Sequence, residues 1–91
     1  VVIESLALAE NELSEVLSVY PNPFRDQLII KNELFSSFVA EVTDIQGKQI
    51  LNVNTQESQT AIDTRNWMQG IYLVKCTLND GRSSVYKLVK E

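Results

Sequence analysis

The chain has 91 residues, of which 44% are apolar and 22% are charged. These proportions are typical of globular proteins, so they exclude an intrinsically disordered chain. No apolar run approaches the roughly 18 residues that a membrane-spanning helix needs, and a domain of this length buries only about 60–65% of its unfolded surface. We therefore expect a soluble domain with a small core and no membrane insertion.

The formal net charge of −4 is unevenly distributed. Residues 1–16 contain four glutamates and no basic residue, whereas residues 17–91 contain eight acidic and eight basic residues. A neutral body offers no basic surface to the phosphates of nucleic acids or of anionic membranes. We therefore expect no nucleic-acid partner.

Residues 1–16 are interpreted as an acidic linker or as the end of a preceding cargo region. The chain starts at Val1 without an initiator methionine and shows no signal-peptide pattern, which indicates a piece of a longer protein. Several apolar residues fit a helical stripe that Glu10 interrupts, namely Ile3, Leu6, Ala7, Leu13, Val16 and Leu17. We expect an exposed connector with local helix.

From residue 17 onward the chain consists of short alternating segments separated by turn residues, as in β-sandwiches and barrels. The first strand is predicted at Leu17–Tyr20. It must end in Tyr20-Pro21-Asn22-Pro23, because the two prolines remove two backbone donors and favour extended conformations before them. A second strand is predicted at Gln27–Lys31, with Leu28 and Ile30 on one face.

A hairpin is predicted around the tight turn Asp44-Ile45-Gln46-Gly47, because aspartate bonds its own downstream backbone and Gly47 tolerates positive φ. The strand before it is Phe38–Thr43, with inward Phe38, Ala40 and Val42. The strand after it is Lys48–Val53, with inward Leu51 and Val53. The polar stretch Asn54–Ser58 is expected to be a loop, followed by a short strand at Gln59–Asp63.

Thr64–Gln69 lacks alternation and is too short for an independent helix, so a single helical or 3₁₀ turn is expected, with Trp67 folded onto the core. Ile71–Leu78 is the strongest strand, with Tyr72, Val74, Cys76 and Leu78 on one face. The turn Asn79-Asp80-Gly81 leads into the last strand, Ser83–Lys90. Seven short strands without long helices predict an all-β, immunoglobulin-like β-sandwich of antiparallel strands in two sheets, with no large cavity.

Residues that support catalysis are poorly represented. The chain has no histidine, so the serine pairs Ser36-Ser37 and Ser83-Ser84 lack the usual general base. Lys75 and Lys87 occupy strand positions without the burial that would make either a base. We expect no enzymatic activity.

Neither metal binding nor thiol chemistry is expected from the sequence. A single cysteine and no histidine exclude a disulfide or a zinc site within the chain, and Cys76 is expected to be a small buried residue rather than a reactive thiol. Asp26, Asp44, Asp63 and Asp80 lie beside turns, where aspartate is favoured for local hydrogen bonds alone, and their spacing matches no calcium loop. We expect no metal and no cofactor.

Two aromatic residues leave a second function open. Trp67 and Tyr72 would form a stacking platform for sugars if both were exposed, although core packing is the favoured role. The alternative function is therefore a carbohydrate-binding or adhesive β-sandwich module of a secreted surface enzyme.

Four blocks occur in a fixed order along residues 17–91: Tyr20-Pro21-Asn22-Pro23, Asp44-Ile45-Gln46-Gly47, Gly70-Ile71-Tyr72-Leu73-Val74 and Tyr86-Lys87-Leu88-Val89-Lys90. Together they resemble the C-terminal sorting domain of the type IX secretion system. The chain departs from the family at Cys76, where an aliphatic or polar residue is more usual. The motif residues that carry the resemblance are Tyr20, Pro21, Asn22, Pro23, Asp44, Gly47, Gly70 and Tyr72.

The resemblance implies a non-enzymatic address tag on a cargo protein located upstream of Val1. It also implies an immunoglobulin-like fold, passage through the periplasm, and export to the cell surface or medium by an outer-membrane translocon. A sortase-like peptidase commonly removes such a domain, and residues 1–16 are the expected place of the cut. The candidate residues for recognition by the translocon are Tyr86, Lys87, Leu88, Val89 and Lys90, with Lys87 and Lys90 expected to be exposed and the strand edge open to a receptor strand.

Overall fold

The computed structural model describes residues 16–33 and 36–91, so the predicted linker conformation of residues 1–15 lies outside the described residues. Every pairing between named strands is antiparallel. The strands are β1 (Leu17–Tyr20), β2 (Gln27–Asn32), β3 (Phe38–Asp44), β4 (Gln49–Thr55), β5 (Gln59–Asp63), β6 (Gly70–Leu78) and β7 (Ser83–Lys90).

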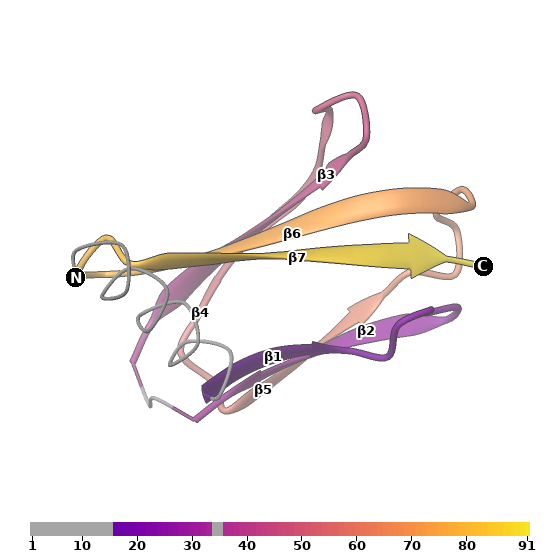
Figure 1. Ribbon diagram of the computed structural model, residues 1–91. Coiled ribbons are helices and arrows are strands. Elements are labelled where there is room, and N and C mark those ends of the chain that lie inside the picture. The colour runs from indigo at the N-terminus through magenta and orange to yellow at the C-terminus, as the bar shows by residue number, and fades with distance from the viewer. Residues whose placement is uncertain (1–15, 34–35) are drawn as a thin grey trace, which may run out of the picture.

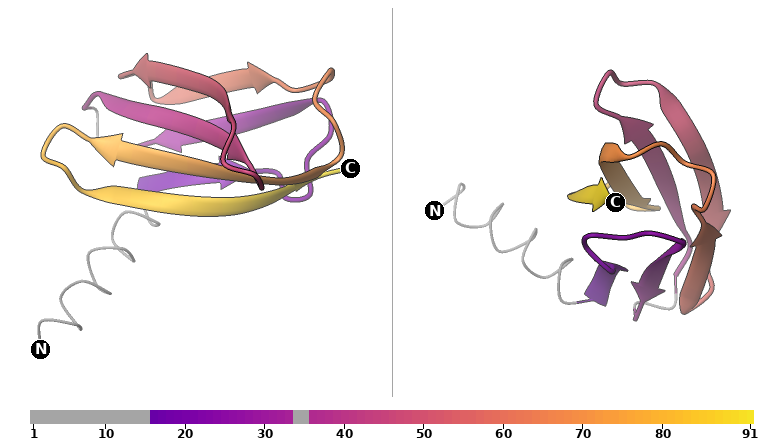
Figure 2. Two further views of the ribbon diagram at one scale, coloured as in Figure 1. Left: turned by 90° about the horizontal axis from the view of Figure 1, so that it is seen from above. Right: turned by 90° about the vertical axis from the view of Figure 1, so that its right-hand side faces the viewer.

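The strands form two packed sheets, as predicted. One sheet has the order β1-β2-β5, and the other has the order β4-β3-β6-β7. Figure 1 shows β6 and β7 side by side across the molecule with the smaller sheet beneath them, and Figure 2 shows the two layers end on. Strand β7 is therefore an edge strand of the larger sheet, as the sequence analysis expected.

The predicted bounds of β1, β5 and β7 are confirmed, and those predicted for β2, β3 and β6 are one residue too short; the strand predicted at Lys48–Val53 begins one residue too early and ends two residues too early. The largest difference is in β4, which runs to Thr55 and takes in the first part of the stretch Asn54–Ser58 that was expected to be a loop. Asn54 and Thr55 pair with Val39 and Phe38 of β3. A neighbouring strand that offers backbone partners therefore overrides the low strand propensity of asparagine.

The core lies between the sheets and consists largely of the side chains that alternation placed inward. The predicted inward residues of β2, β3 and β6 are all buried: Leu28, Ile30, Phe38, Ala40, Val42, Tyr72, Val74, Cys76 and Leu78. Burial raises the pKa of the Cys76 thiol to about 11. The thiol therefore stays protonated at neutral pH and behaves as the expected small apolar residue.

Leu51 and Val53, which were predicted to face inward, are both half-buried, and Leu51 packs against the core. They lie on β4, an edge strand. The register also shifts there: Val42 pairs with Leu51 and Thr43 pairs with Gln49, which leaves Ile50 as an extra residue. A bulge changes the direction in which side chains point, and here Ile50 and Leu51 both pack against the core.

The segment between β5 and β6 makes one hydrogen-bonded turn, in which the Trp67 N–H donates to the Thr64 carbonyl at 3.0 Å. A single bond with this three-residue spacing makes a β-turn, so the segment contains neither the helical turn nor the 3₁₀ turn that was predicted. Trp67 packs against the core, as predicted. Among the described residues, no helix has the length and apolar character needed to cross a membrane.

Candidate recognition surface

Two residues of the proline-rich segment bind the outer edge of β7. The Asn22 side-chain amide donates to the Lys87 carbonyl at 3.3 Å and accepts from the Val89 N–H at 3.0 Å. The Phe24 N–H donates to the Val89 carbonyl at 2.8 Å, and the Phe24 carbonyl accepts from the Glu91 N–H at 2.9 Å. We call Asn22 and Phe24, with these four bonds, the clasp. The clasp satisfies the edge groups of the last strand where an open edge would otherwise invite pairing with another chain.

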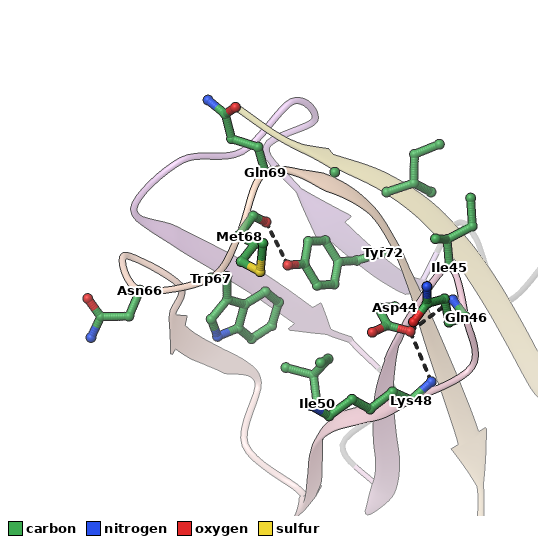
Figure 3. A pocket seen from close by; sticks show the side chains of 12 residues that line it. Asp44, Ile45, Gln46, Lys48, Ile50, Asn66, Trp67, Met68, Gln69 and Tyr72 are labelled. Carbon is green, nitrogen blue, oxygen red and sulfur yellow. Dashed lines mark hydrogen bonds between the residues drawn. The ribbon is translucent and has the colours of Figure 1, made fainter.

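The clasp residue Phe24 is also a central core residue, because its side chain is 0% exposed. Its ring meets the Trp67 ring edge-on at 6.0 Å between centroids and the Tyr72 ring at 5.9 Å. The Tyr72 hydroxyl donates to the Met68 carbonyl at 2.6 Å, as Figure 3 shows. Phe24 therefore ties the edge of β7 to the aromatic end of the core.

Lys90 is buried, so the expectation that its side chain is exposed is wrong. It is 7% exposed, and its ammonium donates to the Arg25 carbonyl and lies 5.9 Å from the centroid of the Phe24 ring. The Thr64 hydroxyl donates to the same carbonyl at 2.9 Å. The physical reason is that the long lysine stem covers apolar surface while its ammonium finds a backbone acceptor.

The other candidate recognition residues are distributed over both faces of β7. Lys87 and Val89 are exposed, whereas Leu88 is buried in the core. Tyr86 is half-buried, and its hydroxyl donates to the Leu17 carbonyl of β1 at 2.6 Å. Burial raises the pKa of Tyr86, so this hydroxyl keeps its proton and joins the two sheets.

The four sequence blocks converge at one end of the sandwich. Asp44 pairs with Tyr72, Gly70 pairs with Lys90, and Phe24 forms an isolated parallel bridge with Lys90. Figure 1 shows the C-terminus at the end where β1 connects to β2. Residues far apart in the sequence thus form a continuous structure around the last residues of the chain.

The individual motif residues have clear local roles. Asp44 caps its turn by accepting from the Gln46 and Lys48 N–H groups at 2.9 Å each, and Gly47 has φ of +87° as predicted. Tyr20 is 41% exposed on the outer face of β1. Pro21 and Pro23 are exposed and end the strand as expected.

A pocket of about 550 Å³ lies beside this end, between the Asp44–Lys48 turn and residues 66–72. Figure 3 shows the Trp67 ring and Ile50 beside each other in its lining. The pocket opens at the surface rather than inside the core, and the exposed Met68 lies at its margin. The expectation of no large cavity concerned the core; this hollow and a second one of about 360 Å³ between β4 and β5 both open at the surface.

The sugar-stacking platform is absent among the described residues. Tyr72 is only 6% exposed, and the half-buried Trp67 packs against it with 5.1 Å between ring centroids. Both rings are therefore used in core packing, the role that the sequence analysis favoured. The alternative of a carbohydrate-binding module loses the feature on which it was based.

Asp26 and Asp63 lie near one another beside Arg65, but within residues 16–33 and 36–91 no group of three or more acidic, cysteine or histidine residues could hold a metal ion. Asp63 forms an ion pair with Arg65 at 2.9 Å, and Asp80 forms one with Arg82 at 2.8 Å. Backbone and side-chain hydrogen bonds from Arg82 lower the pKa of Asp80. Two of the four turn aspartates therefore have local cationic partners.

Arg65 lowers the pKa of Asp63 from 3.8 to about 2, chiefly through the hydrogen bonds that its guanidinium donates to the carboxylate. A lowered folded-state pKa stabilises the fold above about pH 4, and this stabilisation is lost as the pH falls through about 2. We expect Arg65→Ala to raise the pKa of Asp63 only part of the way to 3.8, because the Arg65 N–H still donates at 3.1 Å. A carboxyl-carbon NMR titration measures this change. Arg82→Ala is the control, and an unmoved Asp63 pKa in Arg65→Ala would contradict the assignment.

Sequence reasoning missed the most specific part of this surface. Asn22 and Phe24 lie 65 to 67 residues away from their partners on β7, so no local pattern reveals the contact. The burial of Lys90 did have a signal, since it lies two residues after the inward Leu88 and therefore on the same face of the strand.

The geometry defines an antiparallel β-sandwich whose last strand is hydrogen-bonded to the segment between β1 and β2. Solved structures share this architecture. One is an immunoglobulin-like β-sandwich protein of the DUF3244 family from Bacteroides vulgatus, with 18% identity, a TM-score of 0.73, and coverage of 82% of this chain and 84% of that one. This similarity establishes the immunoglobulin-like fold.

A second similar structure is PorZ, described as an essential bacterial surface component of the type IX secretion system of Porphyromonas gingivalis, with 18% identity and a TM-score of 0.74. The match covers 90% of this chain but only 12% of PorZ. A comparison with curated proteins found no significant match. The pattern of the family described as "Secretion system C-terminal sorting domain" matches residues 18–91.

The chain therefore belongs to the family of type IX secretion system C-terminal sorting domains. The domains of this family carry a sorting signal and are not catalytic. Membership implies interaction with the type IX secretion system and export to the cell surface or extracellular space.

Proposed function

We propose that this domain directs a larger cargo protein, attached upstream of Val1, through the outer-membrane translocon of the type IX system. The observation that carries the proposal is the family match over residues 18–91. The cargo reaches the periplasm first, and the folded domain then presents its address to the translocon. The domain itself supplies recognition and no chemistry.

The recognition surface in this proposal is the end of the sandwich formed by β7 and the clasp. The exposed members of the stretch Tyr86–Lys90 are Lys87 and Val89, and they project from the outer face of an edge strand. The buried members, Leu88 and Lys90, hold the strand in place. Folding therefore presents only part of the last sequence block to a partner.

Removal of the domain after export is the second part of the proposal. A sortase-like peptidase of the secretion system would cut within residues 1–16, upstream of β1. Support comes from the first described residues, because the Val16 carbonyl accepts from the Glu33 N–H at 2.8 Å. A cut before this bond leaves the sandwich intact.

The proposal is tested by fusing residues 1–91 to the C-terminus of a periplasmic reporter in a host with a type IX system. We expect the reporter on the cell surface or in the medium. The reporter alone, and the same fusion in a host without the translocon, should stay in the periplasm. Retention of the fusion in the periplasm of the competent host would refute the proposal.

A further inference from the structure

The clasp covers only part of the outer edge of β7. Its bonds to Lys87, Val89 and Glu91 show that the odd-numbered residues direct their backbone groups outward. Backbone groups alternate in direction along an antiparallel edge. Ser83 and Val85 therefore also direct their N–H and C=O groups outward, and the Lys87 N–H points outward as well. None of the hydrogen bonds found among the described residues satisfies these groups. The open edge therefore runs from Ser83 to Lys87 and ends where Asn22 begins.

Apolar side chains surround the open edge on the outer face of the sheet. Val85 is 58% exposed, and Leu73 on β6 is 37% exposed. Val85 pairs with Lys75 of β6, and Lys87 pairs with Leu73 of the same strand. Natural edge strands are normally protected by charge, proline or a covering segment. The exposed Val85 and the open backbone groups beside it offer the apolar contact and the hydrogen bonds that strand addition uses.

The charges around this edge favour an acidic partner. Lys75 and Lys87 are both exposed, and neither forms an ion pair with any described residue. Glu41 is the acidic neighbour of Lys75 in the register of β3 and β6, whereas the register partner of Lys87 is the apolar Leu73. The positive charge beside the open edge is therefore least balanced at Lys87.

We propose that Ser83–Lys87 is a strand-addition site for an extended acidic segment of the secretion machinery, with an apolar residue opposite Val85 and an acidic residue opposite Lys87. This inference rests on the proposed function for the source of the partner. The added strand bonds the open groups of Ser83, Val85 and Lys87. The Asn22 amide occupies the Lys87 carbonyl and so ends the pairing, which gives the partner a single register.

The test uses the whole chain and a synthetic peptide, acetyl-Glu-Thr-Val-Thr-Glu-amide, whose symmetry permits either strand direction. The expected NMR result is slower hydrogen exchange and shifted resonances at the Val85 and Lys87 amides. The matching Lys-Thr-Val-Thr-Lys peptide should bind about two- to fivefold more weakly at low salt, the range of an exposed ion pair. Equal binding of the two peptides, or shifts located elsewhere, would overturn the proposal.

Two variants sharpen this test. Val85→Pro removes an outward N–H and leaves the bonds to β6 in place, so the domain should fold and lose peptide binding. Lys87→Glu should reverse the preference between the two peptides, whereas Lys48→Glu, a charge reversal at the turn between β3 and β4, should not. Circular dichroism confirms the fold of each variant. If Val85→Pro misfolds, Lys87→Glu alone tests the proposal. The proposal is overturned if Lys87→Glu does not reverse the preference between the two peptides.

Export separates this inference from the proposed function. In the reporter fusion, Val85→Pro and Lys87→Glu should each reduce export, and Lys48→Glu should not. If the parent fusion is exported and both edge variants are exported equally well, the strand-addition site is refuted while the sorting function stands. If the parent fusion is not exported, the sorting function fails, and peptide binding still reports on the edge.

Discussion

Replacing Phe24 with alanine is expected to lower the free energy of unfolding by about 3–5 kcal/mol, the usual effect of truncating a buried aromatic side chain. Phe24 is fully buried, and its ring contacts the rings of Trp67 and Tyr72. It also lies beside the Lys90 ammonium. Because a small domain is stable by only about 5–15 kcal/mol, this one change should bring the protein close to unfolding at physiological temperature.

Urea denaturation followed by the fluorescence of Trp67 measures this loss, since the Trp67 ring lies 6.0 Å from the Phe24 ring. Phe24→Leu keeps most of the buried volume and should be less destabilising. Val85→Ala, at an exposed position, should change stability by only about 0.5 kcal/mol. A loss below about 1 kcal/mol in Phe24→Ala would contradict the central place of Phe24 in the core.

Replacing Asn22 with alanine is expected to open the clasp and to lower the free energy of unfolding by about 1–2 kcal/mol. The Asn22 side chain makes two hydrogen bonds to β7, and each bond contributes about 0.5–1.5 kcal/mol. The loss is moderate because Asn22 is exposed and water can replace part of what is removed. The Val89 amide should exchange with solvent roughly tenfold faster, since about 1.4 kcal/mol corresponds to that factor.

Two further variants show whether the amide geometry of Asn22 matters. Asn22→Asp keeps an acceptor for the Val89 N–H but cannot donate to the Lys87 carbonyl, so its effect should be intermediate. Asn54→Ala is the matched control, because Asn54 is exposed on β4 and should leave the exchange at Val89 unchanged. Unaltered exchange at Val89 in Asn22→Ala would show that the clasp does not protect the edge.

Most of the fold could be predicted from local pattern. Alternation along β6 placed Tyr72, Val74, Cys76 and Leu78 inward, and all are buried. The turn at Asp44–Gly47 was predictable because aspartate and glycine have intrinsic turn chemistry. These features depend on residues that are close together in the sequence, so they could be predicted from it.

The features that were not predicted depend on partners distant in the sequence. The bulge at Ile50 exists only because Val42 and Thr43 pair on either side of it. The clasp joins residues 22–24 to residues 87–91. The proline-rich segment could be interpreted as the end of a strand, but its second role, covering the edge of the last strand, requires the assembled sandwich.

The central claim is that the last strand of the folded domain carries the address. The most direct test measures the fraction of a reporter exported when it is fused to residues 1–91 or to the same domain without Tyr86–Glu91. Leu28→Ala in the full-length fusion is the folding control, with circular dichroism of each isolated domain, because removing a strand also destabilises a sandwich and Leu28 is a buried residue of β2, outside β7 and the clasp. We predict surface or extracellular reporter for the complete domain and for Leu28→Ala, and periplasmic reporter for the truncated domain; full export of the truncated fusion would contradict the claim.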